Sequence, residues 1–124
     1  MPTHRVVLVV DDEEMIRRLL ADVLDEEPGL HAVCVADGAQ ALAACEQAVP
    51  AVALVDVNLP GMSGLEVIRR LKSNPRTARV PLIAFSAGQN REAAVEAGCD
   101  EFVDKPFDLD DLVGRIRRHT PEET

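Results

Sequence analysis

Five polar residues with the chemistry of a metal–phosphate site each stand directly after, or close behind, a short apolar run. They are Asp11, Asp12, Asp56, Ser86 and Lys105. Three carboxylates held a few ångströms apart would raise one another's pKa, and a divalent cation among them would remove that repulsion. Mg²⁺ prefers oxygen ligands and keeps several waters, so one or two direct carboxylates suffice. A lysine ammonium and a serine hydroxyl could complete a phosphate–metal site.

Each of these residues also has an ordinary structural interpretation. Asp12 could cap the helix that follows it, because aspartate is favoured at helix N-caps. Asp56 could be a turn residue before the Asn-Leu-Pro-Gly segment at 58–61. Ser86 alone is typical of a turn or cap, and Lys105 alone is typical of an exposed surface. However, four separate apolar runs end in the groups that such a site needs. This coincidence favours the functional interpretation of the set.

The elements that must position these residues are short strands alternating with helical segments. The apolar runs occupy residues 5–10, 31–36, 51–56, 81–86 and 101–104. Strands that alternate with helices indicate βαβ units with right-handed crossovers and a parallel sheet. We therefore predict a five-stranded, doubly wound α/β domain, in which ligands bind at the carboxyl ends of the strands.

Helical periodicity fills the segments between the predicted strands. Ser63 with Glu66 resembles a capping box that opens the third helix, and Gly98 ends the fourth. The first helix is predicted to turn Ile16, Leu19, Leu20, Val23 and Leu24 inward. The second is predicted to turn Leu42, Cys45 and Val49 inward, and the third Leu65, Ile68 and Leu71.

Composition narrows the class of protein. The 124 residues suit one domain, and the net charge of −9 argues against a nucleic-acid backbone or an anionic membrane as ligand. The cysteines (Cys34, Cys45 and Cys99) are odd in number and form no CxxC pair, which argues against a disulfide framework or a zinc site. The apolar run at 6–10 is too short for a signal peptide or a membrane span, so we expect a cytoplasmic protein.

Four motifs in order resemble the receiver domains of two-component response regulators. They are VVDDEE at 9–14, VDVNLPGMSG at 55–64, FSA at 85–87 and VDKPF at 103–107. The resemblance covers residues 1–119, leaving 120–124 as a C-terminal tail, and is to single-domain, chemotaxis-regulator-like members. It implies a flavodoxin-like (βα)₅ three-layer sandwich with strand order 2-1-3-4-5.

The resemblance also implies roles at the acidic site. Asp56 would be the phosphoacceptor, receiving a phosphoryl group from a phosphohistidine of a histidine kinase or a histidine phosphotransfer protein. The reaction would need Mg²⁺, for which Mn²⁺ could substitute. Asp12 would bind the metal directly, Asp11 would act through water, and Asp56 and the backbone carbonyl of Asn58 would complete the ligands.

Further roles follow from the same resemblance. Lys105 would offset the charge of the transferring group, Ser86 would hydrogen-bond it, and the small Ala87 would leave the site open. Pro106 would follow a cis peptide bond, although proline before a helix is ordinarily trans. Phe102 matches the family's switch aromatic, which turns inward when Ser86 moves, although without the resemblance a core or edge ring is the favoured interpretation. Switching would alter the surface of the fourth helix, fifth strand and fifth helix.

The chain departs from the family pattern in one region. The stretch from Ser86 to Lys105 is about three residues shorter than expected, so the fourth helix, at 91–97, should be short or its leading loop tight. A side chain at position 88 could block or orient water beside the site, but Gly88 has none. The shorter stretch bears on the usual partner surface, and the missing side chain bears on the lifetime of the phosphoryl group.

Other functions remain as alternatives. A haloacid-dehalogenase-type phosphatase would require a second aspartate where this chain has Asn58, and it would need a longer chain for a cap domain. A pseudo-receiver interaction module would commonly lack part of the acidic set, and a flavodoxin-like nucleotide site would require a glycine-rich first turn. We expect a signalling domain rather than an enzyme, limited to self-phosphorylation and slow autodephosphorylation. The sequence leaves open the kinase, the downstream effector and the oligomeric state.

Overall fold

The predicted five-stranded parallel sheet is confirmed by a computed structural model, which describes residues 4–88 and 90–121. Its strand order is β2-β1-β3-β4-β5, as the resemblance implied. The strands are β1 (Arg5–Val10), β2 (Leu30–Val35), β3 (Val52–Asp56), β4 (Leu82–Ser86) and β5 (Glu101–Asp104). The helices are α1 (Glu14–Glu26), α2 (Gly38–Gln47), α3 (Gly64–Ser73), α4 (Arg91–Ala97) and α5 (Leu109–His119). The bounds of β2, β3 and β4 differ by one residue from the predicted strands.

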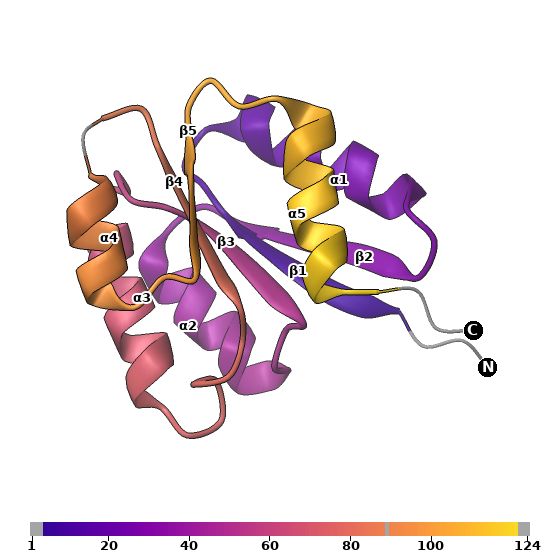
Figure 1. The fold of residues 1–124 in the computed structure, drawn as a ribbon. Coiled ribbons are helices and arrows are strands. Elements are labelled where there is room, and N and C mark those ends of the chain that lie inside the picture. Colours follow the sequence, from indigo (N-terminus) through magenta and orange to yellow (C-terminus); the bar gives the residue numbers. More distant parts are fainter. Residues whose placement is uncertain (1–3, 89, 122–124) are drawn as a thin grey trace.

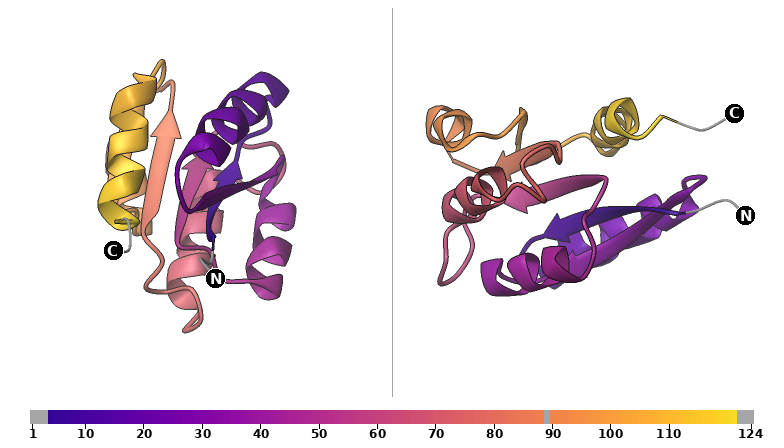
Figure 2. Two further views of the ribbon diagram at one scale, coloured as in Figure 1. Left: turned by 90° about the vertical axis from the view of Figure 1, so that its right-hand side faces the viewer. Right: turned by 90° about the horizontal axis from the view of Figure 1, so that it is seen from below.

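Helices cover both faces of the sheet, which makes three layers (Figures 1 and 2). Alternate residues of a strand point to opposite faces, so Val7 and Val9 pack beneath α1 and α5, while Leu8 and Val10 pack beneath α2, α3 and α4. Both faces are apolar, and the central strands therefore have nearly continuous apolar sequences. No helix in the described part of the chain is long and apolar enough to cross a membrane.

The point at which the strand order reverses determines where the site lies. After β1 the chain crosses to β2 on one side, and β3 lies on the other side of β1. Val10 of β1 pairs with Val55 of β3, and Asp56 pairs with Phe85 of β4. The carboxyl ends of β1, β3 and β4 are therefore neighbours at the topological switch point, where ligands bind in this class of sheet.

Several helical predictions need correction. Leu19, predicted to face inward, is 43% exposed, and on its helix only Leu20 and Leu24 are buried. Val49 is 44% exposed because α2 ends before it, at Gln47. The capping box of α3 is half formed. Ser63 accepts the N–H of Glu66, but the Glu66 carboxylate pairs with arginines of its own helix.

The end of α5 extends the packed structure to the start of the predicted tail. Thr120 is buried, its hydroxyl donates to the carbonyl of Ile116, and its own carbonyl accepts a hydrogen bond from Arg117. Thr120, the first residue of the predicted tail, is therefore packed against the fold. Residues 122–124 of the predicted tail lie outside the described residues.

Glu101 ties the start of β5 to α5 and makes stability depend on pH. Burial raises the pKa of Glu101, but hydrogen bonds with His119 and Arg115 outweigh burial and lower the pKa below its usual 4.5. A lowered carboxyl pKa contributes stability that is complete above the unfolded value and is lost as the pH falls through the native value. We expect Glu101→Gln to cost about 1–2 kcal/mol near neutral pH. Urea unfolding should show the difference shrinking in acid, and a constant difference would contradict this assignment.

Candidate functional site

The three aspartates predicted to form a metal site lie together at the carboxyl edge of the sheet. Asp11 and Asp12 follow β1, and Asp56 ends β3. One carboxylate oxygen of each lies within 4.8 Å of the others. The side chains of Asp11 and Asp56 are buried, whereas Asp12 is exposed. The group therefore has two oxygens in the protein interior and one at its opening.

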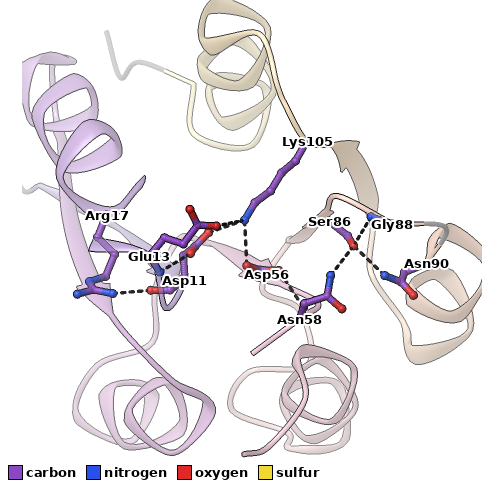
Figure 3. A network of polar contacts seen from close by, with 9 residues as sticks. All are labelled: Asp11, Glu13, Arg17, Asp56, Asn58, Ser86, Gly88, Asn90 and Lys105. Carbon is purple, nitrogen blue, oxygen red and sulfur yellow. Dashed lines mark hydrogen bonds and ion pairs between the residues drawn. The ribbon is translucent and has the colours of Figure 1, made fainter. Parts of the chain in front are cut away.

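Lys105 reaches this cluster from the end of β5 (Figure 3). Its Nζ donates to Asp11 Oδ2 at 3.0 Å and to Asp56 Oδ2 at 2.9 Å. Burial alone would lower the pKa of Lys105, but the hydrogen bonds and charges of Asp56 and Asp11 raise it above its usual value. The ammonium therefore stays charged throughout the neutral range and links the two buried carboxylates.

The positive charge of Lys105 does not balance the negative charge of the three aspartates. The three aspartates and Lys105, when ionised, leave two negative charges uncompensated within this group. Burial raises the pKa of Asp11, although the N–H of Glu13 and the ammonium of Lys105 lower it in part. An all-oxygen donor set of this charge suits a hard divalent cation such as Mg²⁺.

A matching turn orients each buried aspartate. Asp11 Oδ1 accepts the backbone N–H of Glu13, and Asp56 Oδ1 accepts the backbone N–H of Asn58, both at 2.8 Å. These bonds to the residue two positions ahead are typical of aspartate in turns. They fix one oxygen of each carboxylate and leave the second facing Lys105. The carbonyl of Asn58, predicted to bind the metal, belongs to the turn after Asp56.

Asp12 does not cap α1 in the structure. The N-cap position is Glu13, which makes no side-chain cap hydrogen bond. The capping interpretation that the sequence left open for Asp12 therefore receives no support.

Ser86 is held by a set of donors that was not predicted (Figure 3). Its buried Oγ accepts hydrogen bonds from Asn90 Nδ2 at 2.8 Å, Asn58 Nδ2 at 3.0 Å and the N–H of Gly88 at 3.1 Å. The sequence predicted a role for the carbonyl of Asn58 but not for its side chain, and it left Asn90 out. The available signal was the absence of a side chain at Gly88, which leaves room for a later residue to reach Ser86.

Phe102 is already in the core. The residue is 5% exposed, and the guanidinium carbon of Arg91 lies 4.8 Å from the centre of its ring. The resemblance implied that this ring turns inward from an outward position, but in the structure the ring already lies inward. The Lys105–Pro106 peptide, implied to be cis, is cis.

An open groove of about 430 Å³ lies beside Lys105. Its lining is mainly apolar and comes from the start of α1 and from the segments after β4 and β5. Ala87, predicted to leave the site open, is exposed on its wall. The lining residues are Glu13, Ile16, Leu19, Ala87, Lys105, Pro106 and Phe107. The exposed Leu19 thus belongs to a surface next to the acidic cluster.

Comparison with known proteins agrees with this geometry. Residues 7–117 match the family model described as the response regulator receiver domain. The chain is 40% identical over 112 residues to the probable transcriptional regulatory protein TcrX of Mycobacterium tuberculosis. That match covers 90% of this chain and 47% of TcrX, so the chain spans about half the length of this relative.

Solved structures share the fold at lower identity. Chemotaxis protein CheY4 of Vibrio cholerae has a TM-score of 0.86 at 26% identity, over 94% of this chain and 98% of that one. The receiver domain of a Pseudomonas aeruginosa sensor histidine kinase has a TM-score of 0.83 at 26% identity, over 97% and 100%, and holds a magnesium ion in its active-site cleft. From the family match, together with the strand order and the acidic cluster, we conclude that the chain belongs to the response regulator receiver domain family.

Proposed function

We propose that this domain accepts a phosphoryl group on Asp56 and uses it as a signal. The observation that carries the proposal is the contact of Lys105 with both Asp56 and Asp11 inside a cluster of three carboxylates. The arrangement keeps a reactive carboxylate beside a fixed positive charge, which is what phosphoryl transfer requires of a protein.

The metal would be held by Asp11, Asp12, Asp56 and the carbonyl of Asn58. The donors present are all oxygens, and the uncompensated negative charge of the cluster supports Mg²⁺, with Mn²⁺ as a substitute. When bound, the ion would neutralise charge on the phosphoryl oxygens. Asp12 is the exposed member, so it would be the ligand that a cation meets first.

The transfer itself would be an in-line displacement at phosphorus. An oxygen of Asp56 forms the new O–P bond while the N–P bond of the donor phosphohistidine breaks and its electron pair returns to the imidazole. Lys105 lies within reach of the developing charge, because its Nζ is 2.9 Å from the Asp56 carboxylate. The hydroxyl of Ser86 would donate to a phosphoryl oxygen of the product.

The groove beside Lys105 supports a protein as the phosphoryl donor. It is open and mainly apolar, and α1 next to it exposes Met15 at 82% and Leu19. Exposed apolar side chains beside a reactive group are typical of a docking surface. We propose that the donor is a histidine kinase or a histidine phosphotransfer protein that places its phosphohistidine over Asp56. The surface of α4, β5 and α5 would then carry the signal to an effector.

Incubation with Mg²⁺ and phosphoramidate or acetyl phosphate tests this function. Intact mass should show a single phosphoryl adduct that requires the metal. Borohydride reduction of an aspartyl phosphate gives homoserine, and peptide mapping should locate it at position 56. The absence of an adduct from any donor, a phosphohistidine protein included, would favour a pseudo-receiver interaction module instead.

The metal ligands can be tested separately from phosphorylation. We expect Asp12→Ala to weaken Mg²⁺ binding by about tenfold or more, because it removes a carboxylate from the cluster. Glu14→Ala is the matched control, since Glu14 is a neighbouring exposed carboxylate that pairs with Arg18 outside the cluster. Calorimetric titration measures both affinities, and equal losses in the two variants would contradict the ligand assignment.

A further inference from the structure

We propose that Asn90 is a positioning residue that restrains Ser86 before phosphorylation and releases it afterwards, which changes the start of α4. The proposal rests on the proposed phosphorylation of Asp56. It concerns a contact within the segment between β4 and α4, where the side chain of Asn90 turns back to Ser86 (Figure 3).

The Ser86 hydroxyl already has more donors than it can fully satisfy. A hydroxyl oxygen has two acceptor lone pairs, whereas three N–H groups point at this one, and Asn90 makes the shortest contact at 2.8 Å. Ser86 is fully buried, so water cannot replace a lost partner freely. When Ser86 turns its hydroxyl toward a phosphoryl group, it cannot keep all three contacts, and in this proposal Asn90 is the partner that is released.

Asn90 also has an unfilled role at the beginning of α4. It occupies the N-cap position, where asparagine is a favoured residue, yet its side chain makes no cap hydrogen bond. The N-caps Asp37, Ser63 and Asp108 all accept a hydrogen bond from the first turn of their helices. Those three residues have extended backbones, with ψ between 123° and 173°, whereas ψ of Asn90 is 11°. Release from Ser86 would let Asn90 adopt the same capping arrangement.

The local sequence makes this contact possible. A Cβ at position 88 would lie 3.2 Å from Asn90 Nδ2, closer than most contacts of real side chains, so glycine leaves the space that Asn90 uses. The next residue, Arg91, packs on the Phe102 ring and pairs with Asp104. A change at Asn90 is therefore passed to β5 without any inward turn of Phe102.

The restraint can be measured without phosphorylation by a double-mutant cycle. Asn90→Ala and Ser86→Ala, alone and combined, should be non-additive in urea unfolding, with coupling of about three- to tenfold in the unfolding equilibrium constant. Asn74→Ala is the matched control, because among the described residues the Asn74 carboxamide accepts a hydrogen bond only from the nearby N–H of Arg76. It should be additive with Ser86→Ala. Additivity of Asn90→Ala as well would overturn the proposed restraint.

Release is measured by NMR of the side-chain amides in the phosphorylated protein. The chain has three asparagines, Asn58, Asn74 and Asn90, so substitution assigns each signal. Phosphorylation should shift the Asn90 signal and leave Asn74 unchanged. Unphosphorylated Gly88→Ala, which crowds the contact with Ser86 but keeps the Asn90 side chain, should move the backbone signals of α4 toward their phosphorylated positions.

Two results separate the proposals. An unmoved Asn90 signal in a sample whose mass shows the full adduct overturns the release while the proposed function stands. A sample that takes no phosphoryl group overturns the proposed function and the release with it, and the double-mutant cycle still decides the restraint.

Discussion

Asp56→Asn should abolish the phosphoryl adduct while the protein stays folded. The carboxamide has nearly the same shape as the carboxylate, and its oxygen can still accept the N–H of Asn58. It lacks the charged oxygen that attacks phosphorus, so we expect labelling by phosphoramidate to fall by at least about a thousandfold. Intact mass over a time course measures the rate, and circular dichroism checks the fold.

Asp104→Asn is the matched control for this substitution. Asp104 is the neighbour of Lys105 in sequence, but its side chain is exposed, pairs with Arg91 and lies outside the acidic cluster. Its variant should be labelled at close to the wild-type rate. An adduct that survives Asp56→Asn would place the acceptor elsewhere, with the exposed Asp12 as the first residue to test.

The sequence was sufficient to predict the charged part of the site, because strand ends determine it. Parallel strands bring their carboxyl ends to one edge, so residues after β1, β3 and β5 meet whatever their distance along the chain. Lys105 lies 94 residues after Asp11 and 49 residues after Asp56, yet it contacts both. Only the strand order had to come from the family resemblance.

The hydrogen-bond partners of Ser86 could not be predicted in the same way. The contact with Asn90 depends on the path of a short loop and on the side-chain conformation, neither of which follows from periodicity. Helical periodicity likewise gives the face of a helix but not its end, which is why Val49 lies beyond α2. It also gives no measure of how far the sheet extends beneath α1, where Leu19 is exposed beside the groove.

Gly64→Ala should destabilise the fold by at least about 3 kcal/mol, a large share of the stability of a domain of this size. Gly64 begins α3 and is buried against the turn that follows Asp56, with its N–H donating to the carbonyl of Val57. A Cβ there would lie 2.0 Å from the carbonyl oxygen of Asp56 and 2.7 Å from the Cα of Val57. Both neighbours are backbone atoms, so α3 or the acceptor turn itself must move.

Gly114→Ala is the control that separates this clash from the general effect of replacing glycine. Gly114 lies within α5, and a Cβ there would meet nothing within 4 Å, so alanine should stabilise the protein by about 0.5–1 kcal/mol. The chain has no tryptophan or tyrosine, and urea unfolding is therefore followed by far-ultraviolet circular dichroism. Since Gly64 supports the turn that orients Asp56, its variant should also bind Mg²⁺ more weakly than Gly114→Ala. If Gly64→Ala unfolds within 1 kcal/mol of the wild type, α3 can move away from the acceptor turn at little cost, and the close packing inferred beneath Asp56 is wrong.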